Sequence, residues 1–92
     1  MTRQVKLLLE QSEHIKAMDQ MKEHPLYVTY NVKPCGFKPK TNAFNEVFIE
    51  SYYTTKSQSD QKNVDIFENM LNSFEGYSQP AYVTCGKVTF EV

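Results

Sequence analysis

The segment Lys33–Lys40 constrains the fold most, because two prolines and a glycine interrupt the chain there between two strand-like stretches. Proline fixes φ and lacks a backbone N–H, so the segment is predicted to be a loop. The flanking stretches, 26–32 and 44–55, are then predicted to pair with each other across a connection that is longer than a tight hairpin requires.

Both flanking stretches have the composition of strands. Residues 44–55 are rich in β-branched and aromatic residues, which favour strands. Residues 26–32 alternate strictly, which predicts a half-buried strand with Leu26, Val28, Tyr30 and Val32 on one face and Tyr27, Thr29 and Asn31 on the other.

Two helices are predicted. Apolar residues at helical spacing indicate a first helix from about Arg3 to Glu23, with Thr2 as N-cap and Pro25 ending it. The second, from about Ser59 to Glu75, is the clearest amphipathic helix: Ser59 or Asp60 can cap it, Gly76 can end it, and its apolar stripe is Val64, Phe67, Leu71 and Phe74.

The last predicted strand, about Ala81 to Val92, changes phase at Gly86. Either a β-bulge at this glycine restores the inward face, or residues 85–87 form a turn that splits the segment into two short strands. We favour the bulge, since an isolated glycine in a strand pattern commonly marks one.

The order of elements predicts an α+β fold, α-β-β-α-β, in one compact domain spanning residues 1–92. Its sheet would be antiparallel, with three strands, or four if the chain turns at Gly86. Both helices would pack on one face of the sheet. The other face would be open, and the register would decide which aromatic and hydroxyl side chains share it: Tyr27, Thr29, Phe48, Tyr52 or Tyr53, and Tyr82 or Thr84.

Composition excludes several classes of function. A net charge of −1 argues against a dedicated non-specific DNA binder and against an acidic DNA mimic, so any electrostatic function must come from local patches. No apolar run approaches the roughly 18 residues of a membrane span, and the leucines at 7–9 are too few for a signal sequence. We therefore expect a cytoplasmic protein.

Chemistry-bearing motifs are absent. The two cysteines, Cys35 and Cys85, are fifty residues apart and neither they nor His14 and His24 have the spacing of a zinc site, so no metal or cofactor is expected. There is no phosphate-binding glycine run, nucleophile elbow or His-Glu-x-x-His sequence. A binding protein is favoured over an enzyme.

The residues predicted to bind a partner are centred on the basic segment. Lys33, Lys38 and Lys40 suit an anion such as a nucleic-acid backbone or an acidic protein surface, with Phe37 as a contact group. Tyr52 is added from the open face. A loop of this length is also tolerated without a function, in which case Phe37 would fold back on the core.

As a whole, the chain resembles the small phage-encoded anti-CRISPR proteins directed against type I-F surveillance complexes. The resemblance rests on no shared motif, and these proteins share no single fold or site, so no functional residue carries over. It implies stoichiometric binding, in the host cytoplasm, to the assembled complex of Cas protein and guide RNA. Such binding would block recognition of target DNA or recruitment of the nuclease, with contact to Cas subunits and guide RNA and with no membrane or small-molecule substrate involved.

Two other classes stay open from the residues alone. A small nucleic-acid-binding module would place Lys33, Lys38, Lys40 and Lys56 on phosphates, and its affinity would fall steeply with salt. A structural adaptor would instead use the sheet or a helix face to assemble with other chains.

Overall fold

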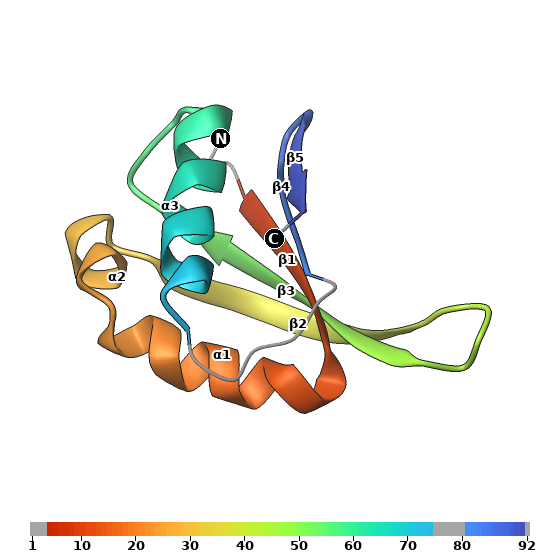
Figure 1. The fold of residues 1–92 in the computed structure, drawn as a ribbon. Coiled ribbons are helices and arrows are strands. Elements are labelled where there is room, and N and C mark those ends of the chain that lie inside the picture. The colour runs from red at the N-terminus through yellow and green to blue at the C-terminus, as the bar shows by residue number, and fades with distance from the viewer. Residues whose placement is uncertain (1–3, 75–80, 92) are drawn as a thin grey trace.

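The computed structural model describes residues 4–74 and 81–91, and confirms the α+β class with an antiparallel sheet (Figure 1). The strands are β1 (Gln4–Glu10), β2 (Lys33–Thr41), β3 (Val47–Thr54), β4 (Tyr82–Cys85) and β5 (Val88–Glu91). The helices are α1 (Gln11–Glu23), α2 (Pro25–Thr29) and α3 (Asp60–Asn72). The strand order β2-β3-β1-β4-β5 makes the sheet larger than the three or four strands expected.

Strand β1 lies in the middle of this sheet, between β3 and β4. The prediction of a helix from Arg3 was therefore wrong over Gln4–Glu10, and the helix begins only at Gln11. Val5, Leu7 and Leu9 are all buried, which is the alternation of a strand with one face on the core. The proposed cap, Thr2, lies outside the described residues.

The stretch after Pro25 is a short helix, so the predicted strand at 26–32 was also wrong. Pro25 is well suited to the first turn of α2, where a backbone N–H has no helical partner. The Nδ1 atom of His24 accepts a hydrogen bond from the N–H of Leu26 at 3.1 Å and caps this turn. Asn31, at φ 51°, then turns the chain into β2.

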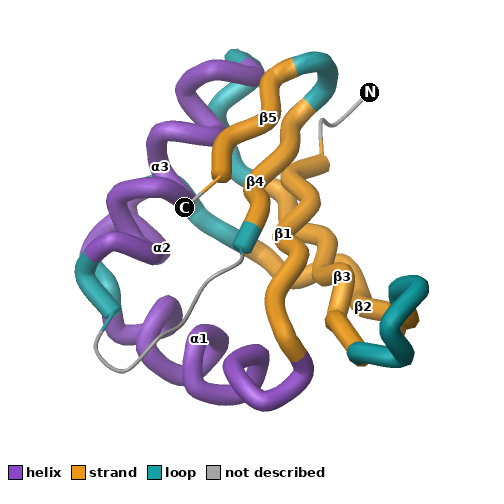
Figure 2. Tube along the Cα trace, turned by 45° about the vertical axis from the view of Figure 1, so that its right-hand side comes forward, coloured by secondary structure: helices purple, strands orange, loops and turns teal. Residues whose placement is uncertain are grey.

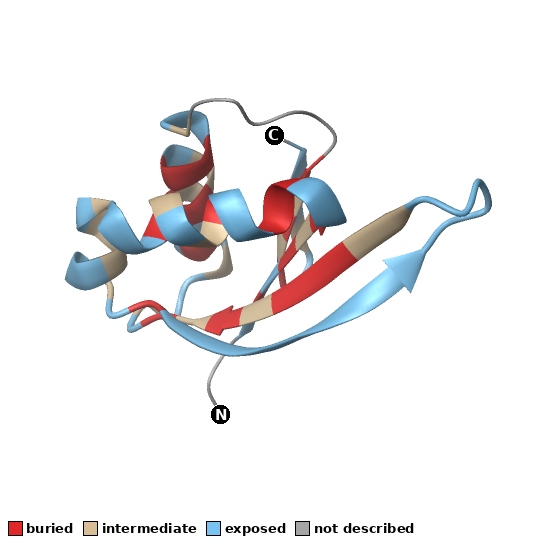
Figure 3. Ribbon diagram, turned by 90° about the horizontal axis from the view of Figure 1, so that it is seen from below, coloured by how far each residue is buried: buried red, intermediate tan, exposed pale blue. Residues whose placement is uncertain are grey.

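The basic segment is itself a strand. Residues Lys33–Thr41 form β2, which pairs antiparallel with β3 along its length and lies at the edge of the sheet. The strand predicted at 44–55 is confirmed over Val47–Thr54 as β3, but it pairs with β1 and with the segment expected to be a loop, and not with residues 26–32. The hairpin closes through Asn42, whose side-chain oxygen accepts from the N–H groups of Phe44 and Glu46, and its tip projects beyond the helices (Figures 1 and 3).

The helix predicted from about Ser59 to Glu75 forms as α3. Ser59 caps α3 by accepting a hydrogen bond from the N–H of Lys62 at 3.3 Å, and Val64, Phe67 and Leu71 are fully buried. Phe74 lies beyond the helix and packs against the core, whereas the expected end at Glu75 and Gly76 lies outside the described residues.

The favoured bulge at Gly86 was wrong, and the alternative, a turn between two short strands, is what forms. Gly86 has φ 61°, a conformation that glycine adopts without strain. A Cβ atom there would lie 2.3 Å from Oδ2 of Asp60, at the start of α3. The turn therefore favours glycine for its backbone conformation, and a larger residue there would also have to displace the Asp60 side chain.

Both long helices cover the same face of the sheet, as predicted (Figure 2). The core between the layers includes Ala17 and Met21 from α1 and Phe67 from α3, and the ring of Phe67 lies 5.2 Å from that of Tyr53. Strand β3 is largely buried, whereas every residue of β2 is exposed (Figure 3). Among the described residues, no helix has the length and apolar character needed to cross a membrane.

Truncating the core residues of α3 should destabilise the fold. Phe67→Ala and Leu71→Ala should each lower the free energy of unfolding by about 2 to 5 kcal/mol, because both side chains are fully buried. Phe44→Ala is the control: this side chain is 83% exposed, so its change should stay within about 0.5 kcal/mol. Urea denaturation measures all three, and equal stability of the core and control variants would show that α3 is not packed on the sheet.

Candidate functional site

The face of the sheet that points away from the helices is the candidate site, and we call it the open face. Its members follow from the strand register, because residues paired across neighbouring strands point to the same side. They are Gln4, Lys6, Leu8, Glu10, Lys33, Gly36, Lys38, Lys40, Phe48, Glu50, Tyr52, Thr54, Tyr82, Thr84, Thr89 and Glu91.

A β-bulge in β2 brings the predicted lysines together. In a regular strand Lys33 would point to the face opposite Lys38 and Lys40, because its number has the other parity. The register shifts between Pro34 and Gly36, so that one extra residue is accommodated and the side-chain phase changes. Lys33, Lys38, Lys40 and Tyr52 all lie on the open face as a result.

Phe37 lies on the opposite side, facing the helical layer. It pairs with Ser51 in the register, and its ring centroid lies 5.5 Å from that of His14 on α1. The ring remains 66% exposed and lines a groove of about 410 Å³ with Ile15 and Met18. Burial lowers the pKa of His14, which favours the neutral imidazole beside this ring. Phe37 therefore cannot share one flat contact surface with the lysines.

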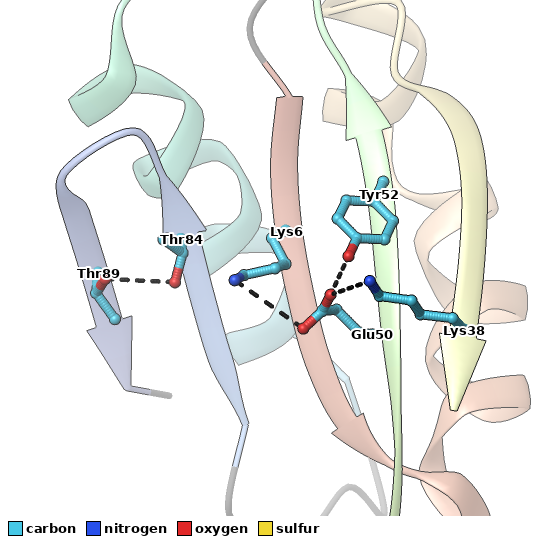
Figure 4. A network of polar contacts seen from close by, with 6 residues as sticks. All are labelled: Lys6, Lys38, Glu50, Tyr52, Thr84 and Thr89. Atoms are coloured by element: carbon cyan, nitrogen blue, oxygen red, sulfur yellow. Dashed lines mark hydrogen bonds and ion pairs between the residues drawn. The ribbon is translucent and has the colours of Figure 1, made fainter. Parts of the chain in front are cut away.

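At the centre of the open face, Glu50 gathers three neighbours from three strands (Figure 4). The hydroxyl of Tyr52 donates a hydrogen bond to Oε1 of Glu50. The Nζ atom of Lys38 lies 3.8 Å from the same oxygen, and that of Lys6 lies 4.0 Å from Oε2. These groups leave the Glu50 side chain only 12% exposed, although it points away from the core.

The hydrogen bond between Tyr52 and Glu50 shifts the pKa values of both groups, in opposite directions. The hydrogen bond from Tyr52 is the largest cause of the lowered pKa of Glu50. Burial opposes it, and the charges of the lysines at 6, 40 and 38 add to the lowering. The same bond raises the pKa of Tyr52, since the phenol must keep its proton to donate. At neutral pH the carboxylate is ionised, and the three lysines around it leave a net positive charge.

Beside this network, toward the turn of the β2–β3 hairpin, the open face is hollowed. A depression of about 590 Å³ is lined on its apolar side by Leu8, Phe44, Phe48 and Tyr82, and on its polar side by Lys40, Thr41, Asn42, Glu46 and Glu50. Phe44 stands at its edge, 83% exposed. A large exposed aromatic beside an apolar hollow is an arrangement typical of contact surfaces.

Some aromatic residues expected on the open face lie elsewhere. Tyr53 is 1% exposed and belongs to the core, whereas Tyr52 is on the open face. Tyr27 and Thr29 belong to α2, while Phe48, Tyr82 and Thr84 are on the open face as the register allowed. Lys6 and Leu8 were missed because residues 4–10 were assigned to a helix. Glu50 lies in the strand that was predicted, but it was not among the side chains expected on the open face, although it has the parity of Phe48 and Tyr52. The alternation Val5, Leu7, Leu9 was the signal that could have placed Lys6 and Leu8 correctly.

In the described part of the chain, no cluster of three or more histidine, cysteine or acidic side chains could hold a metal ion. Cys35 is exposed, whereas Cys85 is buried and its Sγ atom lies 3.5 Å from Oδ1 of Asp60. Comparison of the chain with protein-family models, curated proteins and solved structures finds no match. The fold and the open face therefore define the class on their own: an α+β domain whose described residues form a five-stranded antiparallel sheet with one face that the described helices do not cover.

Removing the hydroxyl of Tyr52 tests the network at the centre of this face. Tyr52→Phe should raise the pKa of Glu50 toward that of an ordinary glutamate, because the hydrogen bond is the largest cause of the lowering. Tyr82→Phe, on the same face but outside the network, should leave it unchanged. Carboxyl ¹³C NMR titration measures both, and an unshifted Glu50 in Tyr52→Phe would mean that the lysines alone hold the carboxylate.

The lowered pKa also makes a stability prediction with a definite sign. A carboxyl with a depressed folded-state pKa adds stability that is present above its unfolded pKa and is lost as pH falls through the folded value. Tyr52→Phe should therefore lose less stability on acidification than the parent protein, and an unchanged loss would contradict the hydrogen bond's role.

Proposed function

We propose that this protein is a non-catalytic inhibitor that binds a type I-F surveillance complex, Cas protein with guide RNA, in the host cytoplasm, and blocks recognition of target DNA. The observation that carries the proposal is the open face, an uncovered sheet surface that combines aromatic rings with lysines around a fixed carboxylate.

The open face is suited to binding because it is rigid before any partner arrives. Its side chains stand on paired strands whose other face is the hydrophobic core. Tyr52 and Lys38 are further held by Glu50, and the ammonium of Lys38 also lies 5.9 Å from the centre of the Tyr52 ring. Side chains that are already ordered lose less entropy on association, so more of the contact energy appears as affinity.

The charge and shape of the open face favour a partner that is negatively charged and carries a flat or apolar group. The lysines on β2 favour a partner with negative charge, and a ribonucleoprotein carries such charge on its guide RNA. The apolar depression beside Lys40 favours a partner that also inserts a flat or apolar group. Both properties are compatible with the stoichiometric inhibition that the resemblance to anti-CRISPR proteins implies.

Titration against a purified type I-F complex tests the proposal directly. DNA binding by the complex should fall to background near equivalence, while its guide RNA and Cas subunits stay intact, because inhibition by occupancy requires one inhibitor per site. Electrophoretic mobility shift with target DNA and native mass spectrometry of the products measure this. Inhibition at strongly substoichiometric amounts, or a modified target, would identify an enzyme instead.

Charge reversal tests whether the open face is the surface used. Replacing Lys33, Lys38 and Lys40 by glutamate should weaken inhibition, because it inverts the charge of the β2 side of the open face. The matched control replaces Lys16, Lys22 and Lys62, which are exposed on helices, and should inhibit like the parent protein. Circular dichroism confirms folding of both, and equal inhibition by the two variants would move the contact away from the open face.

A further inference from the structure

The lysines of β2 lie beside aromatic rings on the open face, at positions that the strand register defines. Lys40 stands directly opposite Phe48 in the β2–β3 register, and Lys38 stands opposite Glu50. Directly paired residues on one face have Cβ atoms about 5 Å apart, so each cation adjoins the side chain across from it. Moving inward from the edge strand, a chain laid on this face would meet first ammonium groups, then the rings and Leu8 of the depression.

This order of groups matches a nucleotide laid across the sheet. The phosphates would follow β2, where the lysines are, and the bases would point inward over Phe48 toward Tyr82. Stacking on aromatic rings needs a base whose flat face is free, and in a duplex both faces of each base are covered by its neighbours. The aromatic lining therefore favours a single strand over a duplex.

Glu50 already occupies the place that a phosphate would take between the lysines. Its carboxylate oxygens accept a hydrogen bond from Tyr52 and form ion pairs with Lys38 and Lys6. A hydroxyl and two ammonium groups are donors that would also suit a phosphate group. Lys40 also lowers the pKa of Glu50 through its charge, but in the register it stands opposite Phe48, where it lines the depression that an incoming strand would enter. A phosphate arriving at Lys38 must displace this carboxylate or share the lysine with it.

We propose that the open face binds single-stranded nucleic acid, with phosphates on Lys38 and Lys40, a base in the depression lined by Phe44, Phe48 and Tyr82, and Glu50 as a built-in competitor for the phosphate. The inference rests on the proposed function in using the same surface, but it concerns the isolated protein. The lysines along β2 would attract either a phosphate backbone or an acidic protein surface, and the rings beside them favour the nucleic acid, because its bases can stack on them whereas carboxylate side chains cannot.

Fluorescence anisotropy with labelled single strands of ~12 nucleotides, as RNA and as DNA of the same mixed sequence, tests the inference without any Cas protein. Binding should weaken steeply between about 50 and 200 mM salt, and the duplex of the same sequence should bind more weakly than either strand. A difference between the RNA and DNA strands identifies which backbone the surface prefers.

Four variants make the test specific. Lys38→Gln with Lys40→Gln should reduce the magnitude of the log–log salt slope by about 1.4, whereas Lys16→Gln with Lys22→Gln, an equal charge change on α1, should leave the slope near the parent value. Phe48→Ala should lower affinity on the order of tenfold by removing a stacking surface. Glu50→Gln keeps an acceptor for Tyr52 but removes the competing charge, so it should bind several-fold tighter.

Glu50→Gln is the decisive variant, because a purely structural role for Glu50 would change the thermal midpoint and not the affinity for the strand. Weaker or equal binding by Glu50→Gln, or equal salt slopes for the two lysine pairs, would overturn the inference. So would the absence of strand binding at low salt. If that absence accompanied stoichiometric inhibition of the surveillance complex, the open face would contact protein, and the proposed function would stand without this inference.

Discussion

The pairing of β1 with strands on both sides is the interaction on which the rest of the structure depends. The sheet contains two hairpins, β2–β3 and β4–β5, and β1 joins them by pairing with β3 over seven positions and with β4 over four. Its inward side chains, Val5, Leu7 and Leu9, are each at most 1% exposed and belong to the same hydrophobic core as residues of both long helices. Because β1 connects the hairpins, its other face, with Lys6 and Leu8, becomes the middle of the open face.

Helices and strands that nearby residues determine could be predicted from the sequence. Those that depend on contacts with distant parts of the chain could not. Helix α3 carries its own cap at Ser59 and an apolar stripe of one period, and β3 is dense in β-branched and aromatic residues. In residues 4–10 the apolar positions fit a strand as well as the start of a long helix, and only pairing with two neighbours decides between them. At 26–29 the alternation favoured a strand, but Pro25 at the first helical position and the cap from His24 determined the outcome.

The candidate site was predictable in part for the same reason. Identifying the lysines needed only composition, but placing three of them on one face needed the bulge between Pro34 and Gly36. That bulge depends on Gly36, whose φ of 144° is rarely adopted by other residues and whose missing Cβ faces open space. The sequence Pro-Cys-Gly was interpreted as a loop signal, because a bulge and a loop use the same residues. Phe37 lies between Gly36 and Lys38, beyond the bulge, so the ordinary alternation of the strand turns its ring to the helical side, away from the lysines.

Glu50 gives the open face two properties that oppose each other. By holding Lys6, Lys38 and the Tyr52 hydroxyl, the carboxylate fixes the side chains of three strands in place and lowers the entropy that a partner must remove. Through the same contacts, the Glu50 carboxylate neutralises part of the positive charge that would attract an anion. A surface selected only for non-specific affinity to phosphates would gain by replacing this glutamate with a neutral residue. Because Glu50 lies among these donors, a partner that brings only negative charge gains the least affinity from this surface. The open face therefore favours a partner that also brings a ring or an apolar group to the adjoining depression.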